Sequence, residues 1–489
     1  MIAEQLRRLA GQSAVYGLGG IVSRVVAIFL LPLYTAYLDP NDLGRVSILL
    51  ALNAVLVTIL RGGVQSAFFR FYFDATNDAS RRRIVRTAFW FTMTSATVGL
   101  LAGWLLADPV ASALSLEGDE WLVRAQFVGL WAQMNYEQLT ALFRVEQRPR
   151  AFVAASLTNV AITIGATIVL VVGLDQGALG VIAGGFTGTL VVYAALLAYR
   201  REQLGFEFDR PLFEAMERFG LPLVPSALAL IAMNFSDRFF ITHLASLDEN
   251  GRYELGARIA GVMVLLLTAF RNAWPAFAYS IADDRVARRT YGFVLTYLVA
   301  LNAWIATGLG LLAPWLVQIL APRNSDFWEG QRVVAPLALG ATLFAAYVVV
   351  SIGVGRARRT GFNWVVTGTA ALANLGLNAT LVPRYGMEGA AAAAAVSLAI
   401  LFLGMAWWAQ RVYPVPYQWR RVATAFGAAV GLVVLGKWLD VSLAVAIALS
   451  AAYPFVLLLL GFSLPQERER LLRALPTRRR SSTAPPPTR

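Results

Sequence analysis

The fold is decided by the stretch RRRIVRTAFWFTMTSATVGLLAGWLL, residues 81–106, in which a cluster of arginines leads into a long apolar run. A helix needs about 20 mainly apolar residues to cross the hydrocarbon core of a bilayer. The same unit recurs along the chain. It predicts about 14 membrane spans, near residues 14–38, 45–66, 86–107, 121–143, 151–173, 177–199, 219–244, 254–275, 291–313, 332–353, 362–383, 387–410, 421–438 and 442–463.

The composition agrees with a chain that lies mostly in lipid. Hydrophobic residues make up 58% of the sequence, charged residues 15%, and the mean hydropathy is +0.60. A soluble domain carries about 25% charged residues. We therefore predict an all-α, polytopic membrane protein without a separate soluble domain, and a disordered basic tail over residues 465–489.

The basic residues alternate between successive connections of the predicted spans. Of the 42 lysines and arginines, 31 fall in every second connection or in the two terminal segments, and eight fall in the alternate connections. Excess Lys and Arg in short loops marks the cytoplasmic side. The pattern predicts that both termini are cytoplasmic. It also accounts for the net charge of +13 without nucleic acid as a partner.

Two short motifs repeat at nearly the same interval. Gly44 and Gly251 follow similar segments and are 207 residues apart, whereas Gly180 and Gly389 are 209 apart. This offset predicts two six-helix halves in parallel orientation, an architecture known among transporters. We assign residues 1–210 to the first half, 211–415 to the second, and 416–464 to two additional helices.

The sequence shows no pattern of residues typical of an enzyme active site. There is no cysteine and a single histidine, so neither a thiol nucleophile nor a histidine-based metal site is expected. Residues 431–437 match most of a phosphate-binding loop, but Trp438 replaces the required Ser or Thr and the segment lies in a predicted span. We expect no cofactor and no metal.

Three arginines interrupt the alternation because they lie inside predicted spans: Arg24, Arg61 and Arg238. A charge at the centre of a span costs at least about 2.5–3.5 kcal/mol on insertion scales, so such a residue faces a wet cavity or a partner. Arg24, about 15 Å into the first span, is either an anion-binding residue of a cavity or a member of a structural ion pair. Arg61 lies near a span end, where its side chain can also reach the lipid headgroups.

Polar residues accompany these arginines. Asn234, Asp237 and Arg238 share the seventh span, and adjacent side chains point about 100° apart on a helix. One of the two charged groups is therefore expected to face the cavity and the other a neighbouring helix. Glu137, in the fourth span, either pairs with an arginine or carries a proton. Glu137 and Asp237 are the candidates for ion coupling.

Several segments resemble one family. They are Gly17–Arg24, Leu31–Thr35, Leu43-Gly44, Ser236–Ile241 and Trp274-Pro275. Together they are similar to bacterial polysaccharide exporters of the multidrug/oligosaccharidyl-lipid/polysaccharide exporter superfamily. The resemblance implies two six-helix bundles around a central cavity that opens alternately to each side. It also implies that Arg24 and Arg238 lie in that cavity.

The resemblance implies a flippase for undecaprenyl-pyrophosphate-linked oligosaccharides of O-antigen, capsule or exopolysaccharide. Together with the charged and polar residues of the spans, it leads us to predict a substrate-binding set of Arg24, Arg238, Asp237, Asn234 and Arg61. The partners would be this substrate, membrane lipids and other polysaccharide-assembly proteins. The alternatives are a peptidoglycan-precursor flippase, which also has a cationic cavity and helices 13 and 14, and an ion-coupled multidrug exporter. The drug branch of the superfamily has an aspartate in span 1 that is missing here.

Overall fold

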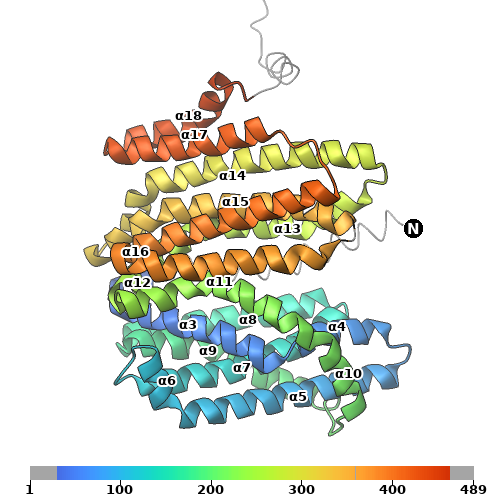
Figure 1. Ribbon diagram of the computed structural model, residues 1–489. Helices are drawn as coiled ribbons and strands as arrows, with labels where there is room; N and C mark the ends of the chain where they lie inside the picture. The colour runs from blue at the N-terminus through green and yellow to red at the C-terminus, as the bar shows by residue number, and fades with distance from the viewer. Residues whose placement is uncertain (1–29, 358, 463–489) are drawn as a thin grey trace, which may run out of the picture.

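The computed structural model describes residues 30–357 and 359–462, and every regular element in these two ranges is a helix (Figure 1). The first group comprises α2 (Leu31–Tyr37), α3 (Pro40–Arg61), α4 (Val64–Asp74), α5 (Asp78–Leu105), α6 (Ala107–Ala113), α7 (Glu120–Val145), α8 (Pro149–Ile168, continued by a π-helical turn to Gly173), α9 (Gly177–Arg200) and α10 (Arg210–Gly220). The second comprises α11 (Val224–Leu244), α12 (Leu247–Ala260), α13 (Val262–Ser280), α14 (Asp284–Leu320), α15 (Gln331–Arg356), α16 (Asn363–Val412), α17 (Trp419–Trp438) and α18 (Leu443–Leu459).

The helices confirm a multi-pass membrane protein. Within the described residues, eight helices are long and apolar enough to cross a membrane, or nine if the bent pair of α10 and α11 forms one span. The total of 14 spans stays a prediction. The first predicted span falls largely in residues 1–29, outside the described ranges.

The 50-residue helix α16 is two helices joined by a sharp turn. Gly386 has φ 52° and ψ −134°, a conformation that glycine adopts without steric cost. The chain then doubles back, because the Asn374 amide donates a 3.1 Å hydrogen bond to Ser397 across the two arms. The arms correspond to the predicted spans at 362–383 and 387–410.

Polar caps start several helices ahead of the apolar runs. The Asp39 carboxylate accepts a 2.7 Å hydrogen bond from the backbone N–H of Asp42, and Asn77 caps α5 in the same way through Ser80. Such caps satisfy N–H groups that have no partner within the helix. Consequently α3 and α5 begin five and eight residues earlier than predicted, at Pro40 and Asp78 rather than at 45 and 86.

Glycines divide two of the predicted spans. Gly62 and Gly63 are both left-handed, with φ 53° and 77°, and they end α3 and begin α4 inside the predicted span 45–66. The predicted span 254–275 is likewise divided at Gly261, between α12 and α13. Hydropathy alone misses such breaks, because glycine does not lower the apolar character of a run.

The two groups of helices meet through equivalent segments of the sequence repeat. A Cβ on Gly44 would overlap the carbonyl oxygen of Leu247, and one on Gly251 would overlap that of Pro40. The 207-residue offset that relates the glycines also relates Pro40 to Leu247. The contact of α3 with α12 is therefore symmetric within one chain, as in a twofold dimer. We call it the glycine junction.

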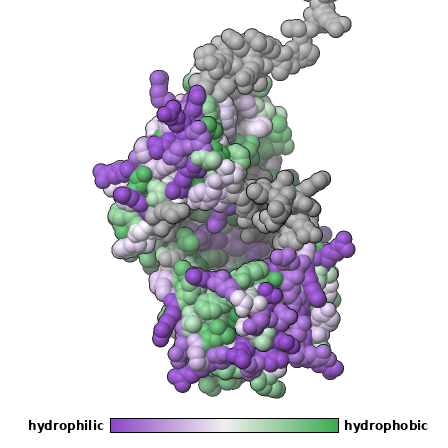
Figure 2. Space-filling view, turned by 90° about the vertical axis from the view of Figure 1, so that its right-hand side faces the viewer, coloured by the Kyte–Doolittle hydropathy of each residue, from purple (hydrophilic) through white to green (hydrophobic). Residues whose placement is uncertain are grey.

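Two further contacts join the groups near the glycine junction. The Asn250 amide donates to the carbonyl oxygen of Gly44 at 3.2 Å. His243, near the end of α11, lies 2.8 Å from the carbonyl oxygen of Ala113, the last residue of α6. In Figure 1, α6 and α12 lie at one end of the molecule and the α4–α5 connection lies at the other. Figure 2 views that other end, where a recess separates the upper and lower parts.

Candidate functional site

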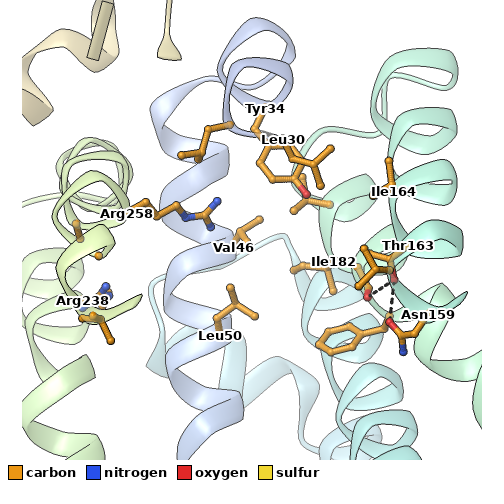
Figure 3. A pocket seen from close by; sticks show the side chains of 18 of the residues that line it. Leu30, Tyr34, Val46, Leu50, Asn159, Thr163, Ile164, Ile182, Arg238 and Arg258 are labelled. Carbon is orange, nitrogen blue, oxygen red and sulfur yellow. Dashed lines mark hydrogen bonds between the residues drawn. The ribbon is translucent and has the colours of Figure 1, made fainter. Parts of the chain in front are cut away.

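A cavity of about 710 Å³ lies between the two groups of helices (Figure 3). Its walls come from α2, α3, α8 and α9 on one side and from α11, α12 and α13 on the other. Most of the lining is apolar, including Leu50, Phe186 and Leu265. The two helices of the glycine junction, α3 and α12, also contribute to the cavity wall, through Val46 and Ala257 respectively.

Two arginines on the cavity wall share one carboxylate. Nη2 of Arg238 lies 3.1 Å from Oε2 of Glu254, and Nε of Arg258 lies 2.8 Å from Oε1 of the same residue. Both arginines line the cavity, and Figure 3 shows Arg258 extending from α12 toward Val46. Two positive charges against one negative charge leave this wall positive.

Burial of this charge cluster costs desolvation free energy, and it also strengthens the attraction between the arginines and a bound anion. The side chains of Arg238 and Glu254 are 13% and 11% exposed. Desolvation strengthens electrostatic attraction within such a site and also penalises any charge left unpaired. Arg238 is further held by a 2.8 Å hydrogen bond to the carbonyl oxygen of Asn234 and lies over the Tyr253 ring, 5.3 Å from its centroid.

Arg258 and Glu254 were missed by sequence reasoning. Arg258 was counted with the basic residues of the connection between the seventh and eighth spans, although it lies just inside the range 254–275 predicted for the eighth span. Glu254 and Arg258 are four residues apart, a spacing that places both side chains on one face of a helix. This spacing was the sequence signal that could have identified the pair. It was weak, since the sequence does not show that this face meets Arg238 of α11.

Asp237 lies in a buried polar network between helices. Its carboxylate accepts hydrogen bonds from the Tyr253 hydroxyl at 2.6 Å and from the Asn378 amide at 3.1 Å. The residue is 3% exposed and is not part of the cavity lining, whereas its neighbour Arg238 is. The two adjacent charges thus point to different surroundings.

Asn234 stands one turn before Arg238 on α11. Its side-chain amide donates to the carbonyl oxygen of Leu230 at 2.6 Å, and its own carbonyl oxygen accepts from Arg238. In this structure Asn234 therefore contributes to the site through its backbone, by orienting the Arg238 guanidinium.

Arg61 and Glu137 form an ion pair away from the cavity. Nη2 of Arg61 lies 2.8 Å from Oε2 of Glu137, and its Nη1 donates to Gln65. The Glu137 carboxylate also accepts from Gln133, which extends a polar chain between α3 and α7. Arg61 is directed to this partner rather than to lipid headgroups, because its side chain is only 15% exposed.

Arg24, the remaining predicted binding residue, lies outside the described residues. Its place relative to the cavity stays a prediction.

Comparison with solved structures shows which fold this is. The chain is similar to the lipid II flippase MurJ in an inward closed conformation, with a TM-score of 0.74 at 12% identity over 94% of this chain and 100% of that one. It is also similar to an inward-facing multidrug resistance MATE transporter of the MOP superfamily, with a TM-score of 0.64 at 14% identity over 80% of this chain and 97% of that one. The architecture is therefore that of polytopic flippases and multidrug transporters.

Sequence comparison identifies the family to which this chain belongs. A family model described as polysaccharide biosynthesis protein matches residues 36–328, and the chain belongs to this family. It is 24% identical over 316 residues to the succinoglycan biosynthesis transport protein ExoT of Rhizobium meliloti, covering 64% of this chain and 61% of that protein. It is 22% identical over 307 residues to the Lsg locus putative protein 1 of Haemophilus influenzae, covering 60% of this chain and 73% of that protein.

These findings confirm the resemblance drawn from the motifs. The protein is a membrane protein of the polysaccharide biosynthesis family with a transporter fold. Its named neighbours include a transport protein, a flippase and a transporter, in line with the expectation that it is not an enzyme.

Proposed function

We propose that this protein flips undecaprenyl-pyrophosphate-linked oligosaccharides across the bacterial cytoplasmic membrane by alternating access. The observation that carries the proposal is the pair Arg238 and Arg258 on the wall of an apolar cavity between two helix groups. A guanidinium offers a planar fork of donors that suits phosphate oxygens and stays charged. The family and the succinoglycan transport protein favour a glycan-bearing substrate.

The orientation follows from the arginine pattern. With the Arg-rich connections in the cytoplasm, the glycine junction closes the outer side and the recess in Figure 2 faces the cytoplasm. The pyrophosphate enters from this side and meets Arg238 and Arg258, and Arg24 of the first span contributes a third charge. The polyprenyl tail stays in lipid through an opening between the first span and spans 7 and 8. The halves then rock to present the glycan outside.

Ion coupling falls to Asp237 or Glu137, the two acids predicted for it. Glu137 is neutralised by Arg61, whereas the donors on Asp237 are the uncharged groups of Tyr253 and Asn378. A carboxylate without a charged hydrogen-bond partner is the better site for an exchangeable cation. We therefore favour Asp237, and expect Asp237→Asn to abolish the dependence of transport on an imposed ion gradient while Glu137→Gln preserves it.

The test is reconstitution into liposomes with undecaprenyl-pyrophosphate-linked oligosaccharide and a probe of outer-leaflet glycan. Arg238→Ala and Arg258→Ala should each reduce the flipping rate at least tenfold. Arg332→Ala is the matched control, because Arg332 is an arginine on α15 outside the cavity that pairs with Glu388. Unchanged flipping in both cavity variants would exclude these residues as the binding site.

The same assay separates the alternatives. Lipid II carries the same pyrophosphate, so a peptidoglycan-precursor flippase would transport it in preference to the other lipid-linked glycans. A multidrug exporter would move a cationic dye instead, which the positive cavity wall disfavours. Dye export without lipid-linked transport would overturn the proposal.

A further inference from the structure

The Glu254 carboxylate accepts hydrogen bonds from three different helices. Arg258 donates from the same helix, α12, Arg238 from α11, and the Ser47 hydroxyl from α3 at 3.1 Å. Ser47 belongs to the other helix group, and it follows Gly44 by three residues just as Glu254 follows Gly251. One carboxylate therefore connects the arginines of the cavity to the glycine junction.

The geometry points to a coupling role: we propose that Glu254 is a positioning residue that makes opening of the glycine junction depend on an anion at Arg238 and Arg258. This inference rests on the proposed function, because the anion is the substrate pyrophosphate. The inference goes further by explaining how binding of the anion in the cavity is transmitted to the glycine junction between the two helix groups.

Competition for the guanidinium groups supplies the driving force. Glu254 neutralises one of the two positive charges, and its third donor, Ser47, connects α3 to α12. A pyrophosphate recruits the same N–H groups and places further negative charge beside the carboxylate. Leaving a buried carboxylate unpaired is strongly unfavourable. Separation of α3 from α12 relieves this cost by admitting water to Glu254.

The arginines retain donors for the incoming anion. Only Nε of Arg258 is used by Glu254, and within the described part of the chain no hydrogen bond occupies its two terminal nitrogens. Arg238 is held independently by the carbonyl oxygen of Asn234. The anion can thus bind the free nitrogens first and then displace Glu254 stepwise.

The chain contains no cysteine, so a single introduced thiol can report on the junction. Val46→Cys places the thiol on the cavity wall, two residues after Gly44 of the glycine junction. Val46 is only 2% exposed. In sealed vesicles with the outer face outward, a membrane-impermeant maleimide labels this thiol only when the junction opens. The probes are undecaprenyl pyrophosphate and, as the uncharged control, undecaprenol.

Undecaprenyl pyrophosphate should raise the labelling rate several-fold and undecaprenol should not. Glu254→Gln should abolish this increase while pyrophosphate binding becomes about threefold to tenfold tighter, because a neutral amide competes less for the guanidinium groups. Ser47→Ala should raise labelling without any ligand and leave binding unchanged. A purely structural ion pair would instead weaken binding in Glu254→Gln.

The outcomes separate this inference from the proposed function. A ligand-dependent increase that persists in Glu254→Gln, or Ser47→Ala labelling equal to that of the parent, overturns the coupling role and leaves the flippase intact. Failure of the parent protein to bind undecaprenyl pyrophosphate overturns the proposed function itself. If Glu254→Gln does not accumulate in the membrane, the labelling of Ser47→Ala alone tests the coupling role. This substitution removes a single hydroxyl, the one that connects α3 to Glu254.

Discussion

Individual charged residues in this protein are defined by the partners that they meet across helices. Asp237 and Arg238 are adjacent in sequence, yet one is enclosed by Tyr253 and Asn378 and the other lines the cavity. Helix geometry predicts that adjacent side chains diverge. It does not say which one faces the cavity, because this depends on how α11 is rotated against its neighbours.

The hydroxyl of Tyr253 offers a test at this scale. Tyr253 is 1% exposed and donates to Asp237, so Tyr253→Phe removes a donor from a buried carboxylate. We expect a loss of stability of about 1–3 kcal/mol, measured as a lower thermal midpoint in detergent. Tyr199→Phe is the control, since Tyr199 is 68% exposed. Equal midpoints for the two variants would show that the hydroxyl does not stabilise the fold.

At the scale of elements, glycines decide how the helices are divided and how they pack. Gly386 turns α16 back on itself, Gly62 and Gly63 separate α3 from α4, and Gly44 and Gly251 bring α3 and α12 into backbone contact. The apolar runs predict where helices exist. The offset of the glycines predicts a repeat, but the direct contact between the repeated segments emerges only in three dimensions.

The glycine junction should be sensitive to a single methyl group. In Gly251→Ala the added Cβ overlaps the carbonyl oxygen of Pro40, a backbone atom that cannot move alone. Overpacking of this kind costs about 1–3 kcal/mol, so the closed junction should lose population and labelling of Val46→Cys should rise without ligand. In Gly308→Ala the added Cβ meets no atom within 4 Å, and labelling should stay at the parent rate. A Gly251→Ala protein that labels like its parent would contradict the role of this contact.

For the whole molecule, the proposed alternating-access mechanism requires the two helix groups to separate on the side where α6 meets α11. His243 spans this boundary through the carbonyl oxygen of Ala113. Cysteines at Ala113 and His243, joined by a short bifunctional maleimide, should therefore block flipping and leave pyrophosphate binding unchanged.

The matched control links two helices of one group. Asp108 and Arg124 form an ion pair between α6 and α7 at 3.5 Å, so cysteines at these positions can be joined in the same way. Movement of the groups against each other does not strain this link, and flipping should continue. Transport that survives the first link but not the second would exclude a rocking motion at this boundary.

The sequence by itself determined that the chain is a helical, multi-pass membrane protein, and it predicts the arginine-marked sides and the internal repeat, because each of these depends on local composition or on spacing along the chain. It also singled out Arg238 as a charge within an apolar run. Only the tertiary structure decided that Arg258 joins Arg238 on the cavity wall, that Arg61 pairs with Glu137, and that Glu254 reaches Ser47. The physical reason is that a charge within lipid is stabilised by a partner on another helix, and helix rotation and packing choose that partner.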